Sequence, residues 1–131
     1  MNDGANNLLD TVKVGAMATV NRDRTPLVTP LHFARFEDSI IWISDPDSRH
    51  ATNALRSGRV EFVVWNDDRQ AVYLNTGALI VDEEKREAAL EAYQKKLGKF
   101  IPKVDKWEVF ISPIGKIDEK TTTQDMWHFV A

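Results

Sequence analysis

Cysteine is absent from the chain. No disulfide, thiolate metal site or cysteine nucleophile can therefore form, and the composition fits a reducing compartment. The apolar runs are only a few residues long, far below the ~20 residues that a membrane-spanning helix needs. The polar N-terminal residues also lack the pattern of a signal peptide. These absences predict a cytoplasmic protein with no membrane partner.

Several functional classes lack the residues that they require. Lys and Arg total 17 against 20 Asp and Glu, so the net charge is −3 and no nucleic-acid partner is expected. The six glycines never occur as Gly-x-Gly, which argues against a Rossmann dinucleotide fold. A Gly-x-Ser-x-Gly elbow is missing, and the three histidines show no metal-ligand spacing. The sequence therefore favours neither a serine hydrolase nor a metalloenzyme.

What the chain contains is typical of one globular domain spanning residues 1–131. Hydrophobic residues make up 43% and charged residues 28%, enough for a core in a chain of this length. Alternation with a period of two predicts strands, and apolar stripes with flanking caps predict helices. The expected strands cover residues 14–20, 25–36, 39–44, 59–65, 70–81, 107–118 and 126–130. The expected helices cover residues 3–12, 49–57 and 83–97.

Short strands joined by tight turns favour antiparallel pairing. Strands with two differently used faces favour a barrel over an open sheet. The expected fold class is therefore mainly β with peripheral helices, arranged as an antiparallel barrel of six to seven strands.

The most informative segment is the one where a strand ends at Ser44 and a helix begins after Ser48. A helix N-terminus offers free backbone N–H groups and a partial positive charge. Arg49 adds a planar guanidinium and His50 a further donor, so the segment could bind a phosphate monoester. In the alternative interpretation, Ser48 is only a helix cap and Arg49 only a solvated side chain. The spacing alone leaves both interpretations open.

Four segments taken together resemble the pyridoxamine 5′-phosphate oxidase-like family of FMN-binding split barrels. The resemblance runs from about residue 15 to residue 80 and is weaker beyond. The segments are residues 18–33 with their central turn, Trp42-Ile43-Ser44, Ser48-Arg49-His50 and Gly58-Arg59-Val60. No segment is specific alone, but their order and spacing are.

The resemblance implies an FMN site. Ser48, Arg49 and His50 would bind the FMN phosphate, and Asn53, one helical turn beyond His50, would reach the same pocket. The strand residues implied to lie along the flavin ring, the ribityl chain or the phosphate are Thr29, Leu31, His32, Ile43 and Ser44. In this family the flavin lies between the two subunits of a homodimer. The partner subunit's Trp65, Tyr73 or Trp127 would then close over it.

The function implied by the resemblance is an FMN-dependent oxidoreductase that acts on a small molecule or electron donor. No protein residue stands out as catalytic. The arginine-bearing final segment of the authentic oxidase has no counterpart here, so a short relative is expected instead of a true pyridoxamine phosphate oxidase. Two alternatives stay open: a flavin- or haem-binding module without turnover, with His32 or His128 as a haem ligand, and a dimeric scaffold with an empty site. Some relatives bind a deazaflavin.

Overall fold

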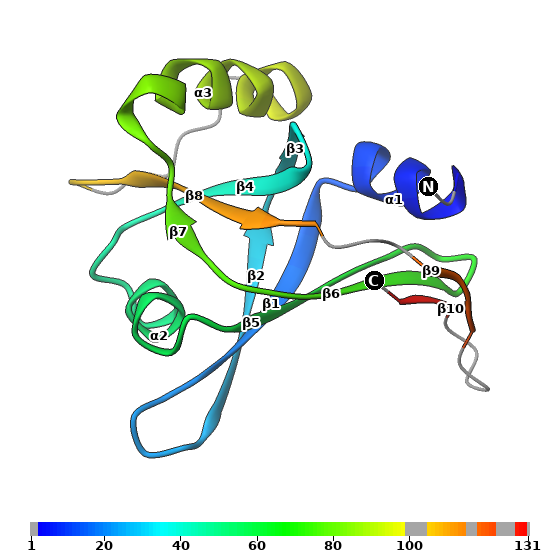
Figure 1. Cartoon of the computed structure of the whole chain (residues 1–131), viewed down its shortest axis with the longest axis horizontal. Helices are drawn as coiled ribbons and strands as arrows, with labels where there is room; N and C mark the ends of the chain where they lie inside the picture. Colours follow the sequence, from blue (N-terminus) through cyan, green and yellow to red (C-terminus); the bar gives the residue numbers. More distant parts are fainter. Residues whose placement is uncertain (1–2, 99–104, 115–117, 123–127, 131) are drawn as a thin grey trace.

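The computed structural model describes residues 3–98, 105–114, 118–122 and 128–130. These residues form three helices and ten strands (Figure 1). The helices are α1 (Asp3–Thr11), α2 (Arg49–Ser57) and α3 (Glu83–Leu97). The strands are β1 (Val14–Val20), β2 (Pro26–His32), β3 (Ala34–Phe36), β4 (Ser39–Ser44), β5 (Val60–Trp65), β6 (Gln70–Thr76), β7 (Leu79–Ile80), β8 (Glu108–Pro113), β9 (Asp118–Thr122) and β10 (His128–Val130).

The strands form two sheets. One has six strands in the order β2-β1-β5-β6-β10-β9, and the other has four in the order β3-β4-β8-β7. Neighbouring strands pair antiparallel, as expected, except that β10 runs parallel to β6. The fold is therefore mainly β with three helices, but its pairing is not purely antiparallel.

Ten strands replace the six to seven expected, because three of the expected strands are divided. The segment 25–36 is split at Phe33, so that β2 lies in the six-stranded sheet and β3 in the four-stranded sheet. The segment 70–81 is split at Gly77 and Ala78, again with one part in each sheet. The segment 107–118 yields β8 and the first residue of β9, with residues 115–117 outside the described part of the chain. At each of the first two divisions the chain crosses between the sheets.

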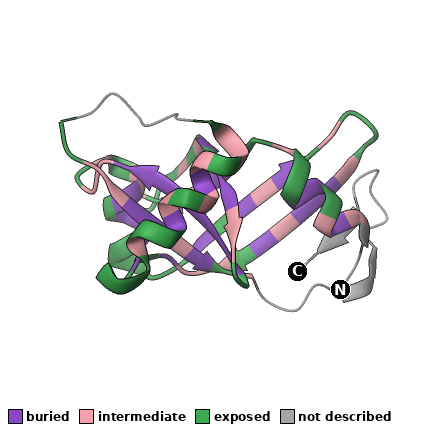
Figure 2. Ribbon diagram, turned by 90° about the horizontal axis from the view of Figure 1, so that it is seen from above, coloured by how far each residue is buried: buried purple, intermediate pink, exposed green. Residues whose placement is uncertain are grey.

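The core has two parts, which lie on opposite faces of the four-stranded sheet. The first part contains Phe33, Trp42, Phe62 and Phe110, and Trp42 stacks on Phe110 with ring centroids 5.6 Å apart. The second part lies between this sheet and α3 and includes Tyr93. Every residue of β4 is consequently buried. Figure 2 shows these buried segments along the strands, with exposed residues on the outer turns of the helices.

Helix α2, which carries the expected phosphate motif, begins and ends where the sequence predicts. The Ser48 hydroxyl accepts a hydrogen bond from the backbone N–H of Ala51 at 3.4 Å. At the other end Gly58 has a φ of +70°, a conformation that favours glycine, and its N–H donates to the carbonyl of Ala54. This helix packs against β1 and places its first turn beside the end of β4.

Candidate functional site

The first turn of α2 brings three of the predicted site residues together. The Ser44 hydroxyl lies 2.8 Å from Nε2 of His50, and the Ser48 hydroxyl lies 3.4 Å from the same nitrogen. The direction of these hydrogen bonds depends on the histidine tautomer. Because β4 ends at Ser44 and α2 begins at Arg49, a four-residue connection is enough to assemble this cluster.

The environment of the cluster suits an anion. Burial lowers the pKa of His50 below its usual 6.5, so its imidazole is neutral at pH 7. The backbone N–H groups of Arg49 and His50 lie in the first helical turn and have no acceptor within the helix. The nearby acids are engaged elsewhere, because Asp47 forms an ion pair with Lys106 and Asp45 accepts a hydrogen bond from the backbone N–H of Asp47. Their charges therefore do not occupy the helix N-terminus.

Beside this cluster, a pocket of about 490 Å³ opens between α2 and the turn that joins β1 to β2. It contains three guanidinium groups, those of Arg22, Arg49 and Arg56, and one carboxylate, that of Asp23. Asp23 accepts hydrogen bonds from the hydroxyl and backbone N–H of Thr25, and these bonds lower its pKa. The remaining residues of the lining are Asn21, Thr25, Thr52 and Asn53. The pocket therefore combines an excess of positive charge with several hydrogen-bonding groups.

Asn53 joins the helix to this turn. Its side-chain amide donates to the Thr19 hydroxyl at 3.2 Å and to the side-chain oxygen of Asn21 at 2.9 Å. Only 3% of Asn53 is exposed. Asn53 lines the same pocket as Arg49, and both of its amide protons are used within the protein, one toward β1 and one toward the turn.

The other predicted site residues lie elsewhere. Ile43 points to the opposite face of β4 from Ser44 and packs in the core beneath α3. Leu31 belongs to the other core cluster, and Thr29 is half-buried opposite Met17 of β1. His32 is exposed at the far end of β2 from the turn, and the six-residue rise along that strand amounts to about 20 Å. The structure therefore does not bring these four side chains into the pocket of Arg49.

Six residues of this pocket were not predicted from the sequence. Four of them lie on the β1–β2 turn and two on α2. Arg49, Thr52, Asn53 and Arg56 are spaced by three, one and three positions, which puts them on one helix face and could have revealed Thr52 and Arg56. The missed turn residues, Asn21, Arg22, Asp23 and Thr25, carry no local signal that links them to α2.

The six-stranded sheet has an exposed apolar face. On this face lie Val28, which is 65% exposed, and Trp65, which is 42% exposed. A cavity of about 210 Å³ on this face is lined by Val63, Trp65, Ala71 and Tyr73. Two of the three aromatic residues predicted to close over a flavin, Trp65 and Tyr73, are therefore neighbours here. The third, Trp127, lies outside the described residues, as does the side chain of His128.

Two further observations concern the described part of the chain. Within it, no group of three or more His, Asp or Glu side chains is arranged to hold a metal ion. None of the three helices there is long and apolar enough to cross a membrane.

Many solved structures share this fold at low sequence identity. The haem storage protein HutZ of Vibrio cholerae aligns with a TM-score of 0.72 and 15% identity, covering 85% of this chain and 87% of its own. A FAD-binding protein of Mesorhizobium loti gives a TM-score of 0.69 and 17% identity, covering 88% and 91% of the two chains. An F420 reductase gives a TM-score of 0.64 and 19% identity, covering 88% and 97%. At such identities the similarity establishes the fold alone.

Family assignment comes from the sequence. Among proteins with curated functions, none matches this chain. The family model for pyridoxamine 5′-phosphate oxidase, however, matches residues 1–115. This range includes strands β1 to β8, helices α1 to α3 and the whole candidate site. The chain belongs to the pyridoxamine 5′-phosphate oxidase family.

Proposed function

We propose that this protein binds FMN and that the first turn of α2 holds the FMN phosphate. The observation that carries this proposal is that the first turn of α2 joins the cluster of Ser44, Ser48 and His50 to Arg49, which lines the basic pocket. Hydroxyl groups, a guanidinium and free N–H groups at a helix N-terminus are the donors that a phosphate monoester requires. The donor set therefore fits the phosphate end of FMN.

We also infer that two copies of the chain pair through the apolar face of the six-stranded sheet. Val28, Val63, Trp65 and Tyr73 expose apolar area there, and an exposed patch of this kind marks an interaction surface. A flavin ring extending from α2 would then be covered by the partner subunit's Trp65 or Tyr73. In this arrangement the six-stranded and four-stranded sheets of each chain would form the split barrel of the family.

The reaction that this site supports best is oxidoreduction of a small molecule, in the cytoplasm. Bound FMN would supply the redox chemistry by accepting a hydride and passing electrons to an acceptor. The chain's own residues would bind and orient it: Arg49 and His50 at the phosphate, and the sheet face at the ring. Because no side chain of the described site is placed as a proton donor to a substrate, we assign binding roles only.

The experiment is a spectrum of the purified protein followed by titration of stripped protein with FMN and with riboflavin. FMN should bind at one molecule per chain. Replacing Arg49 by alanine removes a charge-assisted hydrogen bond, so FMN affinity should fall roughly tenfold to hundredfold. Riboflavin, which has no phosphate, should bind the variant and the wild type equally well. Lys85→Ala removes one positive charge from an exposed site on α3 and serves as the control.

Each alternative gives a distinct result. Equal loss of FMN and riboflavin affinity in Arg49→Ala would contradict the phosphate site. A Soret band in the purified protein would replace FMN by haem as the ligand. Absence of any chromophore together with no FMN binding would leave a dimeric scaffold as the function.

A further inference from the structure

A second basic pocket lies away from α2 and is lined by residues of α1, β3 and α3. Its volume is about 490 Å³. Ala34 of β3 and Ala92 of α3 form part of its wall, so small side chains leave the space open. The charged residues of its lining are Asp10, Arg35, Lys95 and Lys96. None of these residues belongs to the site proposed for FMN.

Positive charge exceeds negative charge in this pocket. Arg35, Lys95 and Lys96 face one carboxylate, Asp10, in a protein whose net charge is −3. Lys13 lies close enough to act electrostatically on Lys96 as well. The pKa of Lys96 is lowered to about 8, chiefly by burial; Asp10 opposes this lowering, and the charges of Lys13 and Arg35 contribute to it. The cluster thus carries unneutralised positive charge in a partly desolvated place.

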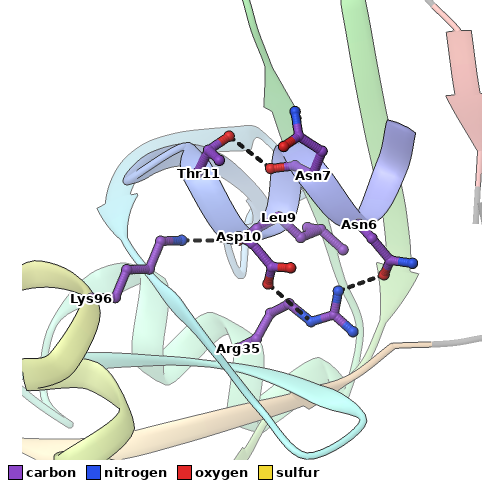
Figure 3. A network of polar contacts seen from close by, with 7 residues as sticks. All are labelled: Asn6, Asn7, Leu9, Asp10, Thr11, Arg35 and Lys96. Atoms are coloured by element: carbon purple, nitrogen blue, oxygen red, sulfur yellow. Dashed lines mark hydrogen bonds and ion pairs between the residues drawn. The ribbon is translucent and has the colours of Figure 1, made fainter. Parts of the chain in front are cut away.

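Two of the cations are held in fixed positions. Nη1 of Arg35 donates to the side-chain oxygen of Asn6 at 2.5 Å, and its Nε lies 3.6 Å from the carboxylate of Asp10. The ammonium of Lys96 donates to the carbonyl of Leu9 at 2.9 Å and lies 3.8 Å from the centroid of the Phe33 ring. Figure 3 shows Arg35 and Lys96 converging on α1 from two different elements.

These contacts leave donors unused. An ammonium has three N–H donors and a guanidinium five. The contacts to Asn6, Asp10 and Leu9 engage only some of those on Arg35 and Lys96. Lys95 is exposed and lines the same pocket. At Arg35 and Lys96 a ligand anion would therefore meet donors whose side chains are already ordered, which lowers the entropic cost of binding.

We propose that this pocket is a second anion site, which binds a phosphate group through Arg35, Lys95 and Lys96. The group could be inorganic phosphate or the end of a phosphate monoester. The competing explanation is that the cations only fasten α1 to the rest of the domain. That explanation accounts for Arg35 and Lys96, which contact α1, but not for Lys95.

The test is NMR of the full chain with ¹³C-labelled lysine, in the Arg49→Ala background so that the α2 site does not contribute. The Lys96 resonance is identified by its loss in Lys96→Met. Inorganic phosphate is titrated at pH 8, with sodium chloride at equal ionic strength as the control anion. Phosphate should shift the Lys96 signal saturably and raise its pKa, because a bound anion stabilises the ammonium.

Variants on α3 separate the two explanations. Lys95→Gln should weaken phosphate binding roughly tenfold or more, as loss of a charge-assisted contact does. Lys85→Gln, at the other end of the same helix and paired with Glu37, should leave it unchanged. Glycerol phosphate, compared with inorganic phosphate, shows whether a monoester or the free ion is preferred. A Lys96 response to phosphate no larger than that to chloride, or an unchanged affinity in Lys95→Gln, would overturn the proposal.

Discussion

The buried amide of Asn53 should contribute more to stability than its position near a helix N-terminus suggests. Both of its donors are used, toward Thr19 and Asn21, and Thr19 is itself only 3% exposed. Each such bond contributes a net 0.5–1.5 kcal/mol, so Asn53→Ala should lower the free energy of unfolding by about 1–3 kcal/mol. For a domain of this size that corresponds to a fall in Tm of about 4–12 °C.

Urea denaturation followed by tryptophan fluorescence measures the change, and Thr52→Ala provides the matched control. Thr52 is the exposed neighbour of Asn53, and its hydroxyl bonds only within α2, to the carbonyl of Arg49. Its replacement should change stability by less than about 0.5 kcal/mol. Amide exchange at Arg24, whose N–H closes the turn on the Asn21 carbonyl, should accelerate in Asn53→Ala. A loss below about 0.5 kcal/mol in Asn53→Ala would refute the role of this amide in fastening the turn.

Four more predictions concern packing, alkaline stability and association. Gly15→Ala should cost about 1–3 kcal/mol of stability by denaturation, because the new Cβ would lie 2.6 Å from the buried Phe62 ring. Between pH 8 and 10.5 the free energy of unfolding should increase with pH. In this range Lys96, whose pKa is about 8 in the folded protein, binds its proton more tightly in the unfolded chain. Lys96→Met should lack this increase. Above pH 10 the free energy of unfolding should decrease with pH. Burial raises the pKa of Tyr93 to about 12, so the unfolded chain loses the phenol proton at a lower pH than the folded protein does. Tyr93→Phe should lack this decrease. Trp65→Glu should convert the inferred dimer to a monomer in light scattering, since it places a charge on the apolar sheet face, and an unchanged mass would contradict that interface.

Local alternation predicted where strands lie but not where they divide. Residues 14–20 and 39–44 were expected as strands and form β1 and β4 with those bounds. The division at Gly77 depends instead on a distant neighbour: a Cβ there would lie 2.8 Å from the carbonyl oxygen of Gly58. This close approach exists only once β5 and β6 have paired, with Val60 opposite Thr76, so a period-two pattern read along the sequence continues through Gly77. The count of strands was therefore too low, although their type was right.

The same division between local and distant contacts governs the candidate site. The cluster of Ser44, Ser48 and His50 spans seven residues, so strand-to-helix spacing alone could place it. The guanidinium-rich pocket could not be placed in this way, because Asn21 and its neighbours come from a turn far earlier in the chain. The orientation of the Ile43 side chain, by contrast, could have been predicted from the local sequence pattern. Since adjacent residues of a strand point to opposite faces, the contact between Ser44 and His50 by itself directs the Ile43 side chain toward α3. If Ile43 contributes to a flavin site, it can do so only through its backbone, and Ile43→Val should then leave FMN affinity unchanged while lowering stability by about 0.5–1.5 kcal/mol.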